Sequence, residues 1–209
     1  MYLYDALIAR HLRHPRGLLG RRVARQMNDA NLPLYALALG QLSLDPAAHI
    51  LDIGFGGGPA FRIMAERVPA GIVYGVDASA TMLKAAERAH ADLIAKRRLA
   101  ILPGDFARLP FQAERIDAAV TVNTIYFWPD PAVPLREAAR VLKPGGRLAI
   151  AFRLPGGAQL AKFERLGFLY RTTAEVAALM VSAGFDHPAV ATGEGRTVPF
   201  FSVAASKAT

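Results

Sequence analysis

The sequence predicts an α/β fold built on a doubly wound, seven-stranded and mostly parallel sheet, with one strand near the C-terminus running antiparallel. Three observations lead to this prediction. Short apolar runs alternate with helical stretches from about residue 47 onward, and the runs at 118–122 and 148–152 are almost wholly apolar, as strands covered on both faces are. The turn at 193–196 is short enough to imply an antiparallel hairpin.

Residues 1–46 are expected to form an N-terminal helical cap, with residues 47–209 as the core of one domain. Apolar residues at helical spacing predict a helix around 19–27 and a second helix over 33–42, with Pro33 in its first turn. Residues 26–31 then form a polar segment between the two helices. Six arginines crowd into this cap, so its surface is strongly basic.

The core alternates strands and helices up to residue 153 and ends in a helix and a hairpin. Strands are predicted near 49–53, 72–76, 99–102, 116–122, 147–153, 188–193 and 198–205. Helices are predicted near 59–67, 79–96, 131–142 and 173–183, the last of them ending at Gly184.

Composition excludes several kinds of chemistry. The chain has no cysteine, so disulfides, thiolate metal sites and a cysteine nucleophile are excluded, and the five histidines show no metal-ligand spacing. The formal net charge of +8 favours an anionic partner or reflects simple solubility, and both interpretations stay open. No apolar run approaches the ~18 residues of a membrane span, and no signal peptide is recognisable, so a cytoplasmic location is expected.

The first strand ends in an acidic, glycine-rich turn that includes Asp52, Gly54, Phe55, Gly56 and Gly58. Glycines at alternate positions permit positive φ angles and leave bare backbone against which a nucleoside-bearing cofactor can lie. A dinucleotide-binding turn would need its third glycine at position 59, which is proline. The spacing is D-x-G-x-G-x-G instead.

Acidic residues also end the next two strands. Asp77, 25 positions after Asp52, is followed by Ala78, and its carboxylate can accept both hydroxyls of a ribose. The alternative is that Asp77 caps the next helix, although Ser79 is better placed for that role. Met82 is expected either on an adenine face or in the core. At the end of the third strand stand Gly104, Asp105 and Phe106; the acid can accept from an adenine amine, although Gly-Asp taken alone indicates a turn.

The fourth strand ends at Asn123, followed by the aromatic run Tyr126, Phe127 and Trp128. Aromatic faces attract a cation such as a sulfonium by ~0.5–2 kcal/mol. The alternative is that these rings pack beneath the following loop. A Lys-Pro-Gly-Gly turn at 143–146 then leads from a helix into the fifth strand.

Taken in order, these segments resemble the class I, Rossmann-like methyltransferases that depend on S-adenosylmethionine (SAM), in particular those acting on small molecules, quinones or lipids. The resemblance implies SAM as cofactor and S-adenosylhomocysteine (SAH) as product. It implies cofactor contacts from Asp52, Gly54, Phe55, Gly56, Gly58, Asp77, Ala78, Met82, Gly104, Asp105, Phe106 and Asn123.

The expected reaction is in-line transfer of a methyl group to a small-molecule or lipid-like acceptor. Tyr126, Tyr35, His11 and His14 are the candidates for a general base, and no metal is expected. The candidate acceptor-binding residues come from the cap, the fourth strand end and the segment after the fifth strand: Met27, Asn28, Asn31, Tyr126, Trp128, Phe168 and Tyr170. Asn28 and Asn31 also suit helix caps.

The basic N-terminus allows more than one interpretation. It can serve as a lid over the site, or bind the surface of an anionic membrane and deliver an apolar acceptor. An RNA methyltransferase and a non-catalytic SAM-binding protein are the remaining alternatives. The aromatic residues lie away from the arginines, which disfavours a nucleic-acid stacking surface. The acceptor atom and the oligomeric state are left open.

Overall fold

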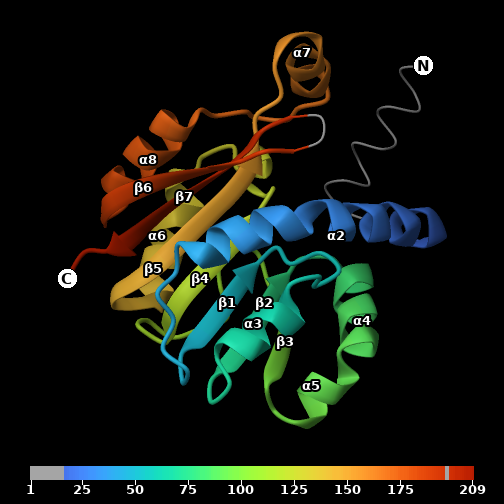
Figure 1. Cartoon of the computed structure of the whole chain (residues 1–209), viewed down its shortest axis with the longest axis vertical. Helices are drawn as coiled ribbons and strands as arrows, with labels where there is room; N and C mark the ends of the chain where they lie inside the picture. The colour runs from blue at the N-terminus through green and yellow to red at the C-terminus, as the bar shows by residue number, and fades with distance from the viewer. Residues whose placement is uncertain (1–16, 196–197) are drawn as a thin grey trace.

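The computed structural model describes residues 17–195 and 198–209 as a sheet flanked by helices (Figure 1). The strands are β1 (His49–Ile53), β2 (Ile72–Asp77), β3 (Leu99–Pro103), β4 (Ile116–Val122), β5 (Leu142–Arg153), β6 (Phe185–Gly193) and β7 (Phe200–Lys207). They form a seven-stranded sheet in the order β3-β2-β1-β4-β5-β7-β6.

The topology confirms the predicted doubly wound sheet. β1 pairs in parallel with both β2 and β4. From β1 the chain first adds β2 and β3 on one side and then β4 and β5 on the other, so the direction of strand addition reverses between β1 and β4. β7 pairs antiparallel with β5 and with β6. In such a sheet the ligand site lies at the carboxyl ends of the strands, beside the point where the strand order reverses.

Alternate residues of the central strands enter two separate hydrophobic cores, as the two-residue period of a strand requires. Leu51 and Ile150 belong to the core on the side of α6 (Ala132–Val141) and α8 (Thr173–Ser182). Ile50 and Ala149 belong to the core on the opposite face, beneath α2 (Gly17–Gly40) and α3 (Phe61–Arg67). The prediction of a sheet buried on both faces is therefore confirmed.

The N-terminal segment differs from the prediction, because α2 is one helix and not two. Pro33 lies inside it, and residues 26–31 are helical instead of forming a polar segment between two helices. An internal proline costs about 3 kcal/mol. Leu34, Tyr35 and Leu39, all buried against the sheet, offset that cost at ~1.5–3 kcal/mol for each large apolar side chain.

Figure 1 shows α2 crossing one face of the sheet, where it contacts β4, β5, β6 and β7. Alanines at 149, 151 and 204 lie beneath it, and their small side chains let the helix approach closely. The described side chains of α2, from residue 29 on, thus form part of a core layer. The division of the chain into a cap at 1–46 and a core stays a prediction.

Three further elements depart from the predicted boundaries. The helix predicted over 79–96 breaks at His90 into α4 (Ala80–Ala89) and α5 (Ala91–Ala95). A helix that was not predicted, α7 (Gly157–Arg165), follows β5. β5 itself begins earlier than predicted, because Leu142 already pairs with Ile116.

The Lys-Pro-Gly-Gly segment lies within β5 as an irregularity of the ladder. Leu142 pairs with Ile116 and Arg147 pairs with Ala118, so residues 143–146 are accommodated between two consecutive pairings. Gly145 has a φ of 73°, which favours glycine over residues with a side chain. Within the described ranges, none of the helices combines the length and apolar character that a membrane span requires.

Candidate active site

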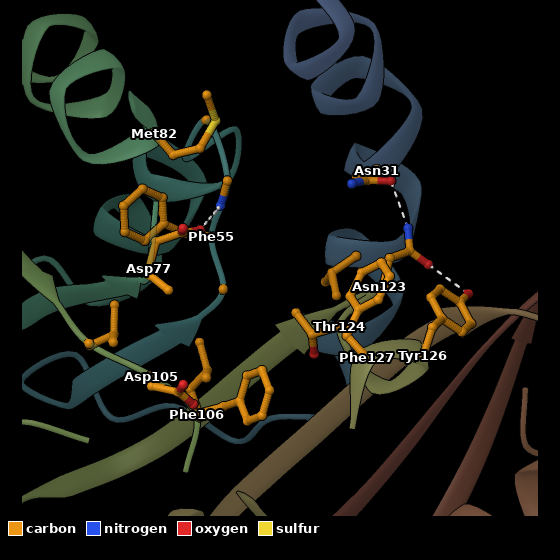
Figure 2. A pocket seen from close by; sticks show the side chains of 18 of the residues that line it. Asn31, Phe55, Asp77, Met82, Asp105, Phe106, Asn123, Thr124, Tyr126 and Phe127 are labelled. Atoms are coloured by element: carbon orange, nitrogen blue, oxygen red, sulfur yellow. Dashed lines mark hydrogen bonds between the residues drawn. The ribbon is translucent and has the colours of Figure 1, made fainter. Parts of the chain in front are cut away.

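A pocket of about 420 Å³ lies at the carboxyl ends of β1, β2, β3 and β4 (Figure 2). Asn31 and Tyr35 from α2 line it on one side, and Gly167 and Leu169 from the segment after α7 also contribute. Its volume is within the range of small-molecule and cofactor sites. The topology of the sheet therefore places the pocket where the sequence predicts a ligand.

The glycine turn forms one wall of this pocket. Gly54, Phe55, Gly56 and Gly57 line it, and the φ angles of Gly54 and Gly56 are 75° and 58°. A Cβ added at Gly56 would meet no atom within 4 Å, so this backbone faces open space. The turn thus offers bare backbone to a ligand, as the glycine spacing predicts.

Gly58, also predicted to contact the cofactor, is not among the lining residues. A Cβ at this position would lie 2.5 Å from the Phe61 ring, so the glycine is required here for packing against α3. Gly57 lines the pocket in its place. The regular glycine spacing did not indicate that Gly57, and not Gly58, would line the pocket.

Asp77 joins the end of β2 to the glycine turn. Its Oδ2 accepts a hydrogen bond from the Gly56 backbone N–H at 2.8 Å, and its Oδ1 accepts from the Ser79 N–H at 2.8 Å. Ser79 occupies the N-cap position of α4 as predicted, but its side chain makes no capping hydrogen bond. Asp77 lines the pocket and also fixes the backbone of two neighbouring turns.

Asp52 lies deeper than the sequence suggests. It is fully buried, it does not line the pocket, and neither carboxylate oxygen makes a hydrogen bond of ordinary geometry with the described residues. Burial raises the pKa of this carboxyl group to about 8; Tyr35 partly offsets the rise, and the Asp77 charge adds to it. Asp52 is therefore largely protonated at pH 7.

Tyr35 lines the pocket but is poorly suited to act as a base. Burial raises the pKa of its phenol well above 10, and the neighbouring Asp52 and Asp77 raise it further. A tyrosine with so high a pKa keeps its proton at neutral pH.

The predicted adenine-contacting residues come together at the ends of β2 and β3. Ala78, Met82, Gly104, Asp105 and Phe106 all line the pocket. The Asp105 Oδ1 accepts the Ala107 N–H at 2.8 Å, which fixes the turn that carries the carboxylate. Figure 2 shows Phe106 beside Asp105, where it supplies apolar surface. Met82, which is 2% exposed, lines the pocket from α4.

At the end of β4, Asn123 adopts a φ of 56° and stands at the centre of a polar network. Its Nδ2 donates to the Asn31 Oδ1 at 2.8 Å, and its Oδ1 accepts from the Tyr126 hydroxyl at 2.9 Å, as Figure 2 shows. The Tyr126 hydroxyl also accepts from the Arg153 backbone N–H. The network links α2 to the ends of β4 and β5.

These contacts argue against Tyr126 as a general base. Its side chain is buried, and burial raises the pKa of its phenol well above the usual value of 10. Its hydroxyl lies 2.8 Å from the Arg153 carbonyl oxygen, within hydrogen-bonding distance. Tyr126 lines the pocket and stabilises the loop around it.

The other aromatic candidates pack behind the pocket and do not line it. Trp128 is buried and its ring packs against Phe106, with the ring centres 5.8 Å apart. Phe168 and Tyr170 pack on Tyr126 at ring-centre distances of 5.9 and 4.9 Å. These three residues therefore pack against other aromatic rings, and their part in acceptor binding stays a prediction.

The cap residues are described only in part. Asn31 lines the pocket from within α2, so it is not a helix cap, and Asn28 is likewise inside the helix. The side chains of Met27 and Asn28 lie outside the described part, as do His11 and His14 altogether. Their predicted roles stay predictions.

Several lining residues were missed by the sequence analysis. Thr124 directly follows the candidate Asn123, so its position after β4 could have indicated it. Phe127, which also lines the pocket, belongs to the aromatic run already identified in the sequence. Gly167 and Leu169 flank the candidate Phe168, so their positions could likewise have indicated them. Among the described residues, no group of three His, Cys, Asp or Glu is arranged to hold a metal ion.

Comparison with known proteins agrees with this geometry. Residues 51–150 match the family model described as a methyltransferase domain. The ubiquinone/menaquinone biosynthesis C-methyltransferase of Syntrophotalea carbinolica is 38% identical over 129 residues, which cover 61% of this chain and 54% of that protein. The chain thus spans about half the length of this curated relative.

Solved structures extend the similarity over most of the chain. A putative methyltransferase in complex with the Trm112 activator from Haloferax volcanii has a TM-score of 0.79 at 22% identity, covering 89% of this chain and 93% of that one. Geranyl diphosphate methyltransferase in complex with SAM has a TM-score of 0.70 at 15% identity, covering 84% of each chain. At these identities the likeness concerns the fold.

Proposed function

Residues 51–150 belong to the class I, SAM-dependent methyltransferase domains, and from this premise we propose that the protein transfers the methyl group of SAM to a small, predominantly apolar acceptor. One observation carries the proposal. The pocket lining combines two acids at the ends of β2 and β3, Asp77 and Asp105, with a group of apolar side chains, Phe127, Pro129 and Leu169. The two groups suit a cofactor and an apolar acceptor.

The residues present fit the cofactor. The open space above Gly56 leaves room for a ligand that approaches the backbone closely. We propose that Asp77 accepts from the ribose hydroxyls and that Asp105 accepts from the adenine amine, with Met82 and Phe106 against the ring. A carboxylate accepts such hydrogen bonds more strongly than a neutral group does.

When bound, SAM supplies an electrophilic methyl group on a sulfonium. The protein's own contribution is to hold the acceptor in line with that group and to exclude water, which can supply ~7–11 kcal/mol of the barrier. Phe127, Pro129 and Leu169 provide an apolar wall for this purpose. Tyr126 keeps the wall in place through its contacts with Asn123 and the Arg153 backbone.

Among the described pocket residues, every titratable side chain either is assigned to the cofactor or keeps its proton at neutral pH. These side chains are the two acids, Asp77 and Asp105, and the phenols of Tyr35 and Tyr126, whose pKa values are raised. We therefore propose an acceptor that needs little help in losing a proton, such as a hydroquinone, an enol or an amine. The quinone-pathway relative at 38% identity supports the first of these.

Calorimetric titration of SAM and SAH into the purified protein and into Asp77→Ala tests the cofactor half. We expect micromolar binding by the wild type and a loss of about tenfold or more in the variant, since a charged hydrogen bond contributes ~1.5–3 kcal/mol. Thermal melting of both proteins is the control for folding. Failure of well-folded wild type to bind either ligand would reject the proposal.

An acceptor screen follows if SAM binds. Hydroquinones with short isoprenoid chains, phenols and small amines would be incubated with SAM and the protein, and SAH formation would be measured. The alternatives of an RNA acceptor and a peripheral membrane contact rest on the basic segment before residue 29, and both stay predictions. The alternative of a non-catalytic SAM-binding protein rests on the lack of a residue in the sequence that by itself proves turnover, and it too stays a prediction.

A further inference from the structure

Asn31 occupies the point where α2 meets the polar end of the pocket. It is half-buried and lines the pocket, and its Oδ1 accepts two hydrogen bonds. One comes from the Asn123 Nδ2 at 2.8 Å and the other from the Arg153 Nη1 at 3.2 Å. The Nη2 of Arg153 also donates to the Ala30 carbonyl oxygen, so this side chain ties α2 to the end of β5.

These partners fix the direction in which the Asn31 amide faces. A guanidinium group has donors and no acceptor, so the atom of Asn31 that faces Arg153 must be the oxygen. The nitrogen, with its two hydrogens, then points the other way. In Figure 2 it points toward the side of the pocket that carries Met82 and Phe55.

The charge of the pocket limits where an anionic group can bind. No lysine, arginine or histidine lines the pocket among the described residues, and Asp77 and Asp105 occupy one half of it. A bound carboxylate would be repelled from that half. It must therefore be received by neutral donors in the half between the ends of β1 and β4.

The glycine turn can offer only some of the hydrogen-bond donors that such a carboxylate needs. The Gly54 backbone N–H already donates to the Val76 carbonyl oxygen at 2.7 Å, and the Gly56 N–H already donates to Asp77. The amide nitrogen of Asn31 is a donor on the opposite side of the same space. It is therefore well placed for the negative end of an amino-acid group.

We propose that Asn31 donates from its amide nitrogen to the α-carboxylate of the cofactor's amino-acid part, and that Arg153 is the positioning residue that holds the amide in this orientation. This inference rests on the proposed function, because it takes SAM as the ligand. It assigns α2 a direct part in cofactor recognition and gives Arg153 a role although it does not line the pocket.

The test compares two ligands that differ in the amino-acid part alone. SAH and 5′-methylthioadenosine share the nucleoside and the thioether, but 5′-methylthioadenosine lacks the carboxylate and the amine. In Asn31→Asp, one oxygen still accepts from Asn123 and Arg153, while a second oxygen replaces the nitrogen that faces the pocket. We expect the affinity for SAH to fall about tenfold or more, with 5′-methylthioadenosine within about threefold of wild type.

Ala36→Asp is the matched control, because it adds the same charge to α2 at an exposed position that does not line the pocket. Both ligands should bind to it as they bind to the wild type. Arg153→Met removes the orienting guanidinium, and we expect it to weaken SAH by about threefold or more without changing 5′-methylthioadenosine. If thermal melting shows that Asn31→Asp does not fold, the Arg153→Met variant is used to test the inference.

Unchanged SAH affinity in Asn31→Asp, or an equal loss for both ligands, would overturn the inference while leaving the proposed function intact. A wild-type protein that binds neither ligand would reject the proposed function itself, and the inference with it. The two failures are therefore distinguishable in one set of titrations.

Discussion

At the scale of single residues, the site combines side chains that the sequence identifies with side chains that only the fold brings together. Asp77 ends β2, and Asp105 and Gly56 lie in the turns after β3 and β1, so their positions could be predicted from the order of motifs. Asn31 could be named as a candidate, but its hydrogen bonds to residues 92 and 122 positions away follow from packing alone. The burial of Asp52 is likewise a product of tertiary structure.

Asp52 should make stability depend on pH. Its pKa in the folded protein is raised to about 8 from an ordinary value of 3.8, so the folded state holds this proton more tightly than the unfolded state does. Its contribution to stability is fully present below about pH 4 and is lost as the pH rises toward 8. Asp52→Asn removes this dependence, since its amide does not titrate.

The free energy of unfolding of the Asp52→Asn variant relative to wild type should therefore increase between pH 5 and pH 7, with a slope approaching ~1.4 kcal/mol per pH unit. Urea unfolding of both proteins at several pH values measures the slope. A constant difference across that range would show that Asp52 is already ionised in the folded protein.

Two glycines of the same turn should respond differently to alanine. At Gly56, a Cβ meets no protein atom, so Gly56→Ala should cost only ~1–2 kcal/mol of backbone strain at its positive φ while weakening SAH binding. At Gly54, a Cβ would lie 2.6 Å from the Thr124 Cγ2, so Gly54→Ala should lose more stability. Thermal melting and titration of both variants separate the two effects, and equal melting temperatures would contradict the expected order.

At the scale of elements, strands were easier to predict than helices. Buried strands are short, apolar and bounded by turns, so all seven were placed close to their observed positions. α2 was predicted as two helices because proline ordinarily ends a helix. Contacts with four strands of the sheet override that local preference, and no sequence pattern within residues 17–40 reports those contacts.

Pro33 should accordingly lower the stability of the folded protein. Pro33→Ala supplies the missing backbone N–H inside α2, at an exposed position where no packing is lost. We expect the restored hydrogen bond to raise the free energy of unfolding by ~1–3 kcal/mol. The loss of proline makes the unfolded chain more flexible, which lowers that gain by ~0.4–1 kcal/mol. Chemical denaturation measures the change. A lower stability in the variant would mean that the bend imposed by proline is needed for α2 to fit the sheet.

At the scale of the whole molecule, the fold and the position of the pocket could be predicted, whereas the acceptor half could not. The cofactor half is built from strand ends that recur in a fixed order along the chain. The acceptor half is assembled from α2, the residues after β4 and a segment after α7, which lie far apart in sequence and carry no shared motif. Phe168 and Tyr170, which were expected there, pack against Tyr126, because burying aromatic faces together stabilises the loop behind the pocket.

The position of β7 has a consequence for the order in which the chain can fold. β7 follows β6 in sequence but lies between β5 and β6 in the sheet. During synthesis, the hydrogen-bonding edge of β5 must therefore stay unpaired until residues 200–207 leave the ribosome, while β1, β2 and β3 can already pair. An exposed strand edge is prone to aggregation. The nascent protein thus carries an uncovered edge at β5 until β7 arrives to pair with it.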